Sequence, residues 1–386
     1  MTFFLVSSAI KVFVVFNMIM VGVALLTLAE RRICAWMQDR LGPNRVGPQG
    51  ILQPAADGLK NFLKEETSPA MADKTLFTLA PIVSFVPALL TFGVIPFASP
   101  LPTKWGPVPM VVADLPVGFL YILAISSLGV YGIVLAGWAS NNKYALLGGL
   151  RASAQMISYE IALGMSTVAV LLLAGNVTLS QVIVQQQAGA WFVIPLTLAF
   201  VIFFISALAE TNRLPFDLPE AEAELIAGYH TEYSAMKFSM FYIAEYSNMV
   251  TASALMATLF FGGWDIPFTS WDSGDPTVLK TLATLAVFGA KTLFFLFTYI
   301  WIRWTLPRFR YDQLMALGWK VLLPLALIYI TILAVAIWYL RVPLGWDYGP
   351  GMAWTLGGLN LALLVILVWW LDRGRIVSGS VSEEAA

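Results

Sequence analysis

The segment from residue 209 to residue 246 reads AETNRLPFDLPEAEAELIAGYHTEYSAMKFSMFYIAEY, and it decides how the rest of the chain is interpreted. It holds seven carboxylates against two bases, Arg213 and Lys237, whereas the chain on either side is almost entirely apolar. Charge runs usually form solvated faces, but Glu245 lies inside an apolar run long enough to cross a bilayer. Carboxylates at membrane depth are costly and by default mark a path for protons, ions or a ligand. We therefore expect a membrane protein that handles protons in this segment.

The composition excludes several classes of protein. Of the 386 residues, 59% are hydrophobic and 12% are charged, whereas a soluble domain carries roughly 25% charged residues. The balance of 22 bases and 23 acids argues against a nucleic-acid partner. The single cysteine, Cys34, and the single histidine, His230, cannot form an internal disulfide, hold an iron–sulfur cluster or bind haem on both axial sides. Any redox cofactor must therefore lie on other chains, and no metal site is expected.

The apolar runs predict transmembrane helices. Each is about 20 residues long, enough to cross ~30 Å of hydrocarbon at ~1.5 Å per residue, whereas a barrel would show alternating segments of ~10 residues. We expect an all-α, polytopic bundle in one domain, residues 1–375, followed by a disordered tail, 376–386. The nine runs are 4–28, 76–99, 117–138, 154–174, 190–209, 238–261, 280–302, 321–340 and 352–371.

The distribution of bases predicts the orientation of the chain. If the N-terminus lies outside, the inside loops hold seventeen lysines and arginines and the outside loops hold three. Cytoplasmic loops carry the excess of basic residues. We therefore expect the acidic segment and the C-terminus to face the cytoplasm.

The first inside loop, from Glu30 to Asp73, is too long for a plain connection. Its GPNRVGPQG sequence is typical of turns. Apolar residues then recur at near-helical spacing over 51–64 and predict an amphipathic helix at the membrane surface. Such a helix is either an interfacial anchor or a docking surface for another subunit. The arginines that precede it favour the docking surface.

Pro215 and Pro219 exclude a continuous helix through the acidic segment. In a helix, Glu220 and Glu224 would share one face and Glu222 would point away. Carboxylates held close together and away from water cannot all ionise, so that we expect them to titrate as a coupled unit near neutral pH.

Glu160 and Lys291 also lie within apolar runs. Glu160 lies nine residues beyond Arg151, on the order of 13 Å deeper in the membrane if the segment is helical. It either pairs with a nearby hydroxyl or shares a buried pathway with Glu210. Lys291 has apolar sequence neighbours, and we interpret it as a snorkelling or internally paired lysine in preference to a proton relay.

Several blocks together closely resemble one family, the quinone-site membrane subunit of respiratory complex I (the H subunit in bacteria, subunit 1 in mitochondria). They are AERRICAWMQDRLGPNRVGPQGILQPAADGLKNFLKEE, RASAQMISYE, AETNRLPFDLPEAEAELIAGYHTEY, FYIAEY and PRFRYDQLM, and they run from Glu30 to Lys320 in the family order. Many members have eight spans, so that the ninth would be a C-terminal addition to a core of eight.

The resemblance implies a multi-pass subunit of the bacterial inner membrane that guides quinone and couples its reduction to proton translocation. FMN and iron–sulfur clusters would lie on partner subunits, and this chain would bind no cofactor. The partners would be peripheral-arm subunits, small neighbouring membrane subunits, quinone and lipid. The implied quinone-binding residues are Arg31, Arg40, Gln53, Asp57, Tyr242, Tyr246 and Arg308. The implied proton-coupling path comprises Glu160, Glu210, Asp217, Glu220, Glu222, Glu224, Glu232 and Glu245, with Arg213 as counter-charge.

Three alternatives remain at this point. The nearest is the related membrane subunit of a membrane-bound hydrogenase or of a ferredoxin- or deazaflavin-linked oxidoreductase, which neighbouring genes would distinguish. A stand-alone proton-coupled transporter would show internal repeats and interrupted helices, which this sequence does not display. A purely structural anchor would leave the carboxylates at membrane depth unexplained.

Overall fold

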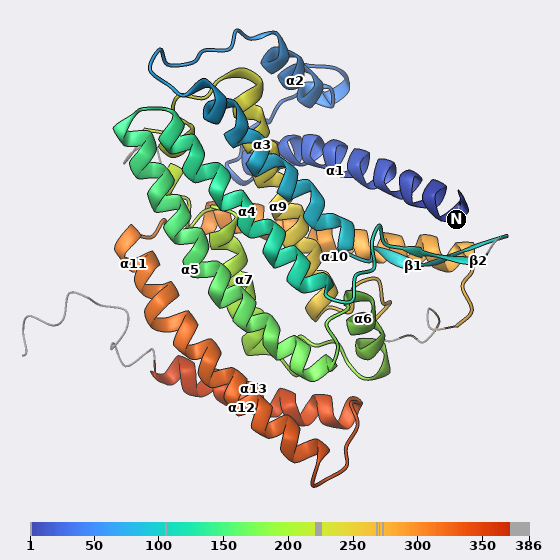
Figure 1. Ribbon diagram of the computed structural model, residues 1–386. Coiled ribbons are helices and arrows are strands. Elements are labelled where there is room, and N and C mark those ends of the chain that lie inside the picture. The colour runs from blue at the N-terminus through green and yellow to red at the C-terminus, as the bar shows by residue number, and fades with distance from the viewer. Residues whose placement is uncertain are drawn as a thin grey trace, which may run out of the picture.

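The computed structural model describes residues 2–104, 106–220, 226–267, 269, 271 and 274–370, and long apolar helices dominate it (Figure 1). The α-helices are α1 (Thr2–Met37), α2 (Gln53–Leu63), α3 (Lys74–Leu90), α4 (Gly118–Ala139), α5 (Lys143–Ala174), α6 (Leu179–Ala188), α7 (Thr197–Glu210), α9 (Ala235–Phe260), α10 (Val278–Thr305), α11 (Tyr311–Ala316), α12 (Leu323–Arg341) and α13 (Pro350–Trp370). Short 3₁₀ turns lie at Pro48–Gly50, Thr91–Val94, Leu218–Glu220 and Gly228–His230, and a π-helical segment lies at Leu317–Leu322. Strands β1 (Ala98–Thr103) and β2 (Gly106–Met110) form an antiparallel hairpin.

The helical class of fold is confirmed, and each predicted apolar run coincides with a helix. Among the described residues, seven helices are long and apolar enough to cross a membrane. The exceptions are α7, whose 14 residues rise about 21 Å at ~1.5 Å per residue, and α9, which has 26 residues but is not among the seven. The count of nine spans therefore stays a prediction. The amphipathic helix predicted over 51–64 is present as α2.

Several predicted boundaries are wrong. Helix α3 ends at Leu90 rather than at 99, and α7 begins at Thr197 rather than at 190. Two other helices are longer than predicted. Helix α5 begins at Lys143 rather than at 154, because the side chain of Asn142 caps it by accepting a hydrogen bond from the backbone N–H of Tyr144. Helix α1 continues to Met37, so that Glu30 lies within a helix and not at the start of a loop. Both helices extend beyond their apolar runs, where hydropathy gives no signal.

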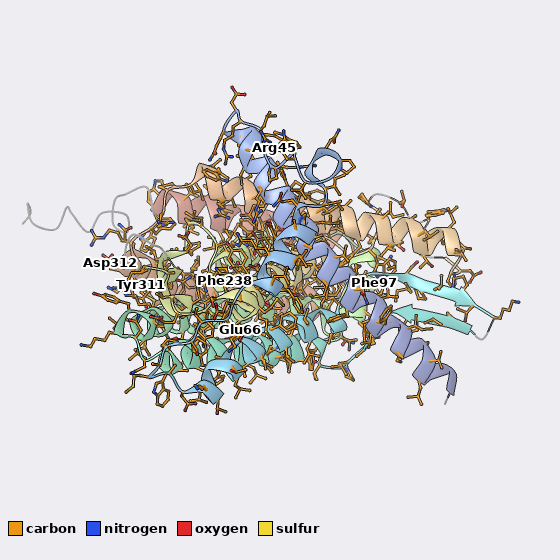
Figure 2. All side chains as sticks on the ribbon, turned by 90° about the horizontal axis from the view of Figure 1, so that it is seen from above. Arg45, Glu66, Phe97, Phe238, Tyr311 and Asp312 are labelled. Carbon is orange, nitrogen blue, oxygen red and sulfur yellow. The ribbon has the colours of Figure 1, made fainter. Side chains whose placement is uncertain are left out.

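Helices α5 and α9 form the centre of the bundle. Helix α5 packs on α4, α7 and α12, and α9 packs on α3, α10 and α7. Every residue of α9 from Thr251 to Phe260 is buried, and many of them are Ala, Ser or Thr, which allow close approach of membrane helices. Helices α12 and α13 lie along the edge of the bundle away from α1 (Figure 1). Figure 2 shows Tyr311 and Asp312 at one end of the molecule and Phe97 on the opposite side, near the base of the hairpin.

Candidate functional site

A cavity of about 750 Å³ lies between α1, α2, the first half of α9 and the end of α10. Apolar side chains such as Met20, Val23 and Phe62 form much of its wall, and polar side chains are interspersed. Ligand pockets of this size are typically apolar with a few polar groups that fix the orientation of the ligand. The cavity is therefore suited to a largely apolar molecule with a polar head.

Five of the seven predicted quinone-binding residues line this cavity, namely Arg31, Arg40, Asp57, Tyr242 and Tyr246. Gln53 contributes indirectly, because its amide donates a hydrogen bond to Asp57 at 3.0 Å. Asp57 also pairs with Arg31 at 2.6 Å, which links α2 to α1. The turn before α2 is tight, and at Gly50, where φ is +77°, an added Cβ would clash with the carbonyl oxygen of Pro43.

The seventh residue, Arg308, is not among the residues that line the cavity. Its guanidinium instead donates two hydrogen bonds to Asp217, at 2.7 and 2.9 Å. This bidentate pair ties the segment after α10 to the segment after α7. A role for Arg308 in quinone binding stays a prediction.

A buried charged cluster forms part of the cavity wall. Its centre is the carboxylate of Glu30, which is 4% exposed. This carboxylate accepts hydrogen bonds from the Tyr246 hydroxyl at 2.6 Å, from Arg213 at 3.2 Å and from Arg303. Sequence reasoning missed Glu30 as a site residue and treated Arg303 only as a basic residue of an inside loop. The one available signal was the position of Glu30 at the end of an apolar run.

Arg213 connects this cluster to the acidic segment. Its Nε lies 2.8 Å from Glu245 Oε1, its Nη1 lies 3.2 Å from Glu30, and its guanidinium lies 4.3 Å from the centroid of the Tyr246 ring. Burial alone would lower the pKa of Arg213, but the two carboxylates raise it above its usual value. Arg213 is therefore a permanent cation shared by two buried carboxylates, as expected for an internal counter-charge.

A glutamine on α5 positions the segment that carries Arg213. The amide nitrogen of Gln155 donates to the carbonyls of Ala209 and Phe216, at 2.9 and 2.8 Å, and lies 3.1 Å from Asn212 Oδ1. Gln155 is fully buried, and buried polar groups are costly unless paired. These hydrogen bonds therefore fold the segment after α7 back against α5.

Two small cavities continue from Glu245 into the bundle. The first, about 40 Å³, is lined by Glu245, Glu210 and Asn248, among others. The second, about 30 Å³, is lined by Glu210, Asn248 and Thr251, among others. Each has room for at least one water, which needs about 10–15 Å³ by this measure of volume, and polar groups line both. Arg213 therefore links Glu30 to Glu245, a water-sized space links Glu245 to Glu210, and a second such space lies beside Glu210.

The remaining predicted path residues lie in different surroundings. Glu160 is half-buried on α5 and lies within electrostatic range of Glu210. Glu232 accepts a hydrogen bond from Asn142 at 2.7 Å. The backbone of Glu220 ends a 3₁₀ turn, but its side chain, Glu222 and Glu224 lie outside the described part of the structure. Their roles stay predictions.

Lys291 has internal partners far from the cavity. Its ammonium donates to the carbonyls of Phe261, Gly263 and Asp265, at 2.6, 2.9 and 2.7 Å, and lies 4.2 Å from the centroid of the Trp191 ring. These contacts hold the segment after the C-terminal end of α9 against α10. They agree with the interpretation of Lys291 as an internally paired residue.

The fold and site define a class of protein: a multi-pass helical membrane protein in which a large, partly apolar cavity adjoins a chain of buried charges. A model of the family described as NADH dehydrogenase matches residues 10–334, and the chain belongs to this family.

Relatives at about half identity support the assignment. The chain is 53% identical over 322 residues to an H subunit of the NADH-quinone oxidoreductase of Geobacter metallireducens, an alignment that covers 83% of this chain and 94% of the relative. It is 48% identical to an H subunit of the NADH-quinone oxidoreductase of Cytophaga hutchinsonii, covering 86% and 97% of the two chains. It is 51% identical to NADH-ubiquinone oxidoreductase chain 1 of Chondrus crispus, with the same coverage.

Proposed function

We propose that this chain is the membrane subunit of an NADH–quinone oxidoreductase. In this role the chain admits quinone from the bilayer and couples the reduction of quinone to proton transfer along a path of buried carboxylates. The observation that carries the proposal is the cavity of about 750 Å³, whose wall includes the buried Glu30 cluster. The reaction, oxidation of NADH by quinone, is inferred from the names of the relatives. The cavity supplies a space suited to an apolar tail and a polar head group.

In this proposal the chain binds and orients quinone and carries no electrons itself. Electrons reach quinone through the flavin and iron–sulfur clusters of partner subunits. Tyr242 and Tyr246 offer aromatic faces and a hydroxyl to the bound molecule, and Arg31 with Asp57 holds α2 at the side of the cavity. The exposed apolar side chains of α2 that do not line the cavity, Leu59 and Leu63, form a surface on which a peripheral subunit docks.

Coupling would begin at Glu30. Reduction of quinone consumes protons and changes the charge in the cavity, and Glu30 and Tyr246 lie in its wall. Arg213 is shared between Glu30 and Glu245. A loss of charge at Glu30 therefore strengthens the electrostatic attraction between Arg213 and Glu245. Protons then move between Glu245 and Glu210 through the first water-sized space, and onward through the second, beside Glu210, to partner membrane subunits.

The proposal includes a location and an orientation. The subunit lies in a bacterial inner membrane, with the N-terminus outside and the C-terminus in the cytoplasm, as the bias of basic residues predicts. The mouth of the quinone cavity then faces the cytoplasmic half of the membrane, where the peripheral arm sits.

A glycine in the wall of the cavity provides the test. An added Cβ at Gly58 meets no atom within 4 Å, and leucine favours a helix over glycine by up to about 1 kcal/mol. Gly58→Leu should therefore preserve α2 while it narrows the cavity. We expect a loss of at least ten-fold in NADH–quinone activity, whereas NADH oxidation with a soluble artificial acceptor is kept.

The matched control is Gly289→Leu, at a helical glycine with equally open surroundings that does not line the cavity. It should leave both activities unchanged in the assembled complex. Unchanged quinone activity in Gly58→Leu, or equal loss of both activities, would contradict the proposed quinone path.

A further inference from the structure

An apolar groove lies between the last two helices, remote from the charged cluster. Helices α12 and α13 both rest against α7 but make little contact with each other. The space between them is about 310 Å³, with Leu198 of α7, Tyr329 and Ile332 of α12, and Leu363 of α13 in its wall. Lys320 is the one charged residue among the described residues that line it.

A buried polar contact keeps the groove open. Asn360 of α13 is fully buried, accepts a hydrogen bond from the Tyr329 hydroxyl at 2.9 Å and donates one to the carbonyl of Pro195 at 2.5 Å. A shift that closed the groove would break these bonds and leave buried polar groups unpaired. An unfilled space would forfeit dispersion contacts along its walls. The groove is therefore preformed and requires an apolar occupant.

The length of the groove suits one acyl chain. Its lining extends from Lys320, in the π-helical segment, to Ile332 of α12, which is about 18 Å at ~1.5 Å per residue. One leaflet contributes about half of the ~30 Å hydrocarbon thickness, or ~15 Å. A lipid tail that starts at Lys320 would end near Ile332.

The end of the groove at Lys320 carries the features of a lipid headgroup site. Lys320 is exposed and forms no ion pair or hydrogen bond within the described residues. It lies in the π-helical segment, where the N–H of Leu323 bonds to the carbonyl of Gly318, and such segments are frequent at functional sites. Trp370 lines the same end, and tryptophan is enriched at the membrane–water interface.

We infer that this groove binds one anionic glycerophospholipid, with an acyl chain between α12 and α13 and the phosphate at Lys320. Basic pockets between membrane helices recognise anionic headgroups in this way. The family match ends at residue 334, so that α13, which supplies the wall of the groove from Leu363 to Trp370, lies outside it. The site is thus a property of the added helix and does not depend on the proposed quinone path.

Photoactivatable lipids test the inference in the assembled complex. The complex is reconstituted with phosphatidylglycerol or phosphatidylcholine that carries a diazirine in one acyl chain, and the labelled peptides are mapped by mass spectrometry. We expect phosphatidylglycerol to label the peptides of α12 and α13 about five-fold more, the ratio that corresponds to about 1 kcal/mol for one basic residue near the surface. Lys320→Gln should reduce this ratio to about one. Ile332→Trp, which fills the groove, should lower labelling by both lipids.

Lys74→Gln is the matched control, because Lys74 is an exposed lysine at the start of α3, and it should leave the five-fold ratio unchanged. Quinone activity per assembled complex should be unaffected in Lys320→Gln, which separates this site from the proposed quinone path. Equal labelling by the two lipids in the unsubstituted complex would overturn the inference. So would an absence of labelling by either lipid, since another protein would then cover the groove.

Discussion

Replacement of Glu30 by glutamine keeps the volume of the side chain and removes the charge at the centre of the cluster. Glu30 is 4% exposed and accepts hydrogen bonds from Tyr246, Arg213 and Arg303. Removal of one partner from a buried ion pair costs about 3–5 kcal/mol, because the opposite charge is left uncompensated. Glu245 still compensates Arg213, so that we expect the lower end of this range, about 3 kcal/mol.

Hydrogen exchange measures this loss where it occurs. A local loss of about 3 kcal/mol raises the population of the opened state roughly 100-fold, at 1.36 kcal/mol for each factor of ten. The effect should appear in peptides that cover residues 27–37 of α1 and 299–305 of α10, in the assembled complex. Quinone-linked activity should fall in the same variant, because the wall of the cavity loses its carboxylate.

The control is Asp312→Asn, which breaks an exposed pair. The side chains of Arg310 and Asp312 are 77% and 66% exposed, and exposed pairs contribute about 0–1 kcal/mol. We expect less than a five-fold change in exchange for this variant. In the double variant Glu30→Gln with Arg303→Gln, part of the protection should return, because one unpaired cation is removed. Indistinguishable exchange in Glu30→Gln and Asp312→Asn would refute the reasoning.

Three further predictions concern other charged residues. Lys291→Met removes three hydrogen bonds from a charged donor, each contributing about 1.5–3 kcal/mol. The Tm of the complex should therefore fall, while the number of protons translocated per quinone reduced should not change. A loss of proton translocation in an assembled, folded complex would contradict this. Complexes with Glu210→Gln or Glu222→Gln should assemble but lose most proton translocation in reconstituted vesicles. Glu210→Asp should lose less, because aspartate still titrates. Full proton stoichiometry in both Gln variants would leave the acidic segment without a coupling role. Burial lowers the pKa of His230 to about 4 from its usual 6.5; the folded state therefore resists protonation, and stability that is present above pH 6.5 is lost as the pH falls toward 4, by at most about 3 kcal/mol. Relative to the native complex, His230→Gln should show a smaller fall in Tm between pH 7 and pH 4, and parallel curves would argue against a buried neutral imidazole.

The class of fold could be predicted from the sequence because it follows from local properties. A run of about 20 apolar residues favours a helix, because a helix satisfies its own backbone hydrogen bonds in hydrocarbon, and each predicted run overlaps a helix. The spacing of apolar residues over 51–64 likewise predicted α2. The prolines at 215 and 219 interrupt the helix as expected. Helix ends were predicted less well, because Asn142 and the polar end of α1 extend helices past the point where hydropathy falls.

Only part of the candidate site could be predicted from the sequence, and there is a physical reason why the rest could not. Residue types at membrane depth, such as Glu245 and Arg213, are conspicuous in sequence because burial of charge is costly there. Which charges meet is decided by contacts between helices that are far apart in the chain. Glu30 meets Arg213 and Arg303 across separations of 183 and 273 residues. No local pattern encodes such pairings, nor the large cavity beside α2, the water-sized spaces around Glu210 or the groove that α12 and α13 leave open. The sequence by itself determined that the chain is helical, lies in a membrane and concentrates charge in one segment, whereas only the tertiary packing decided which of those charges share a site.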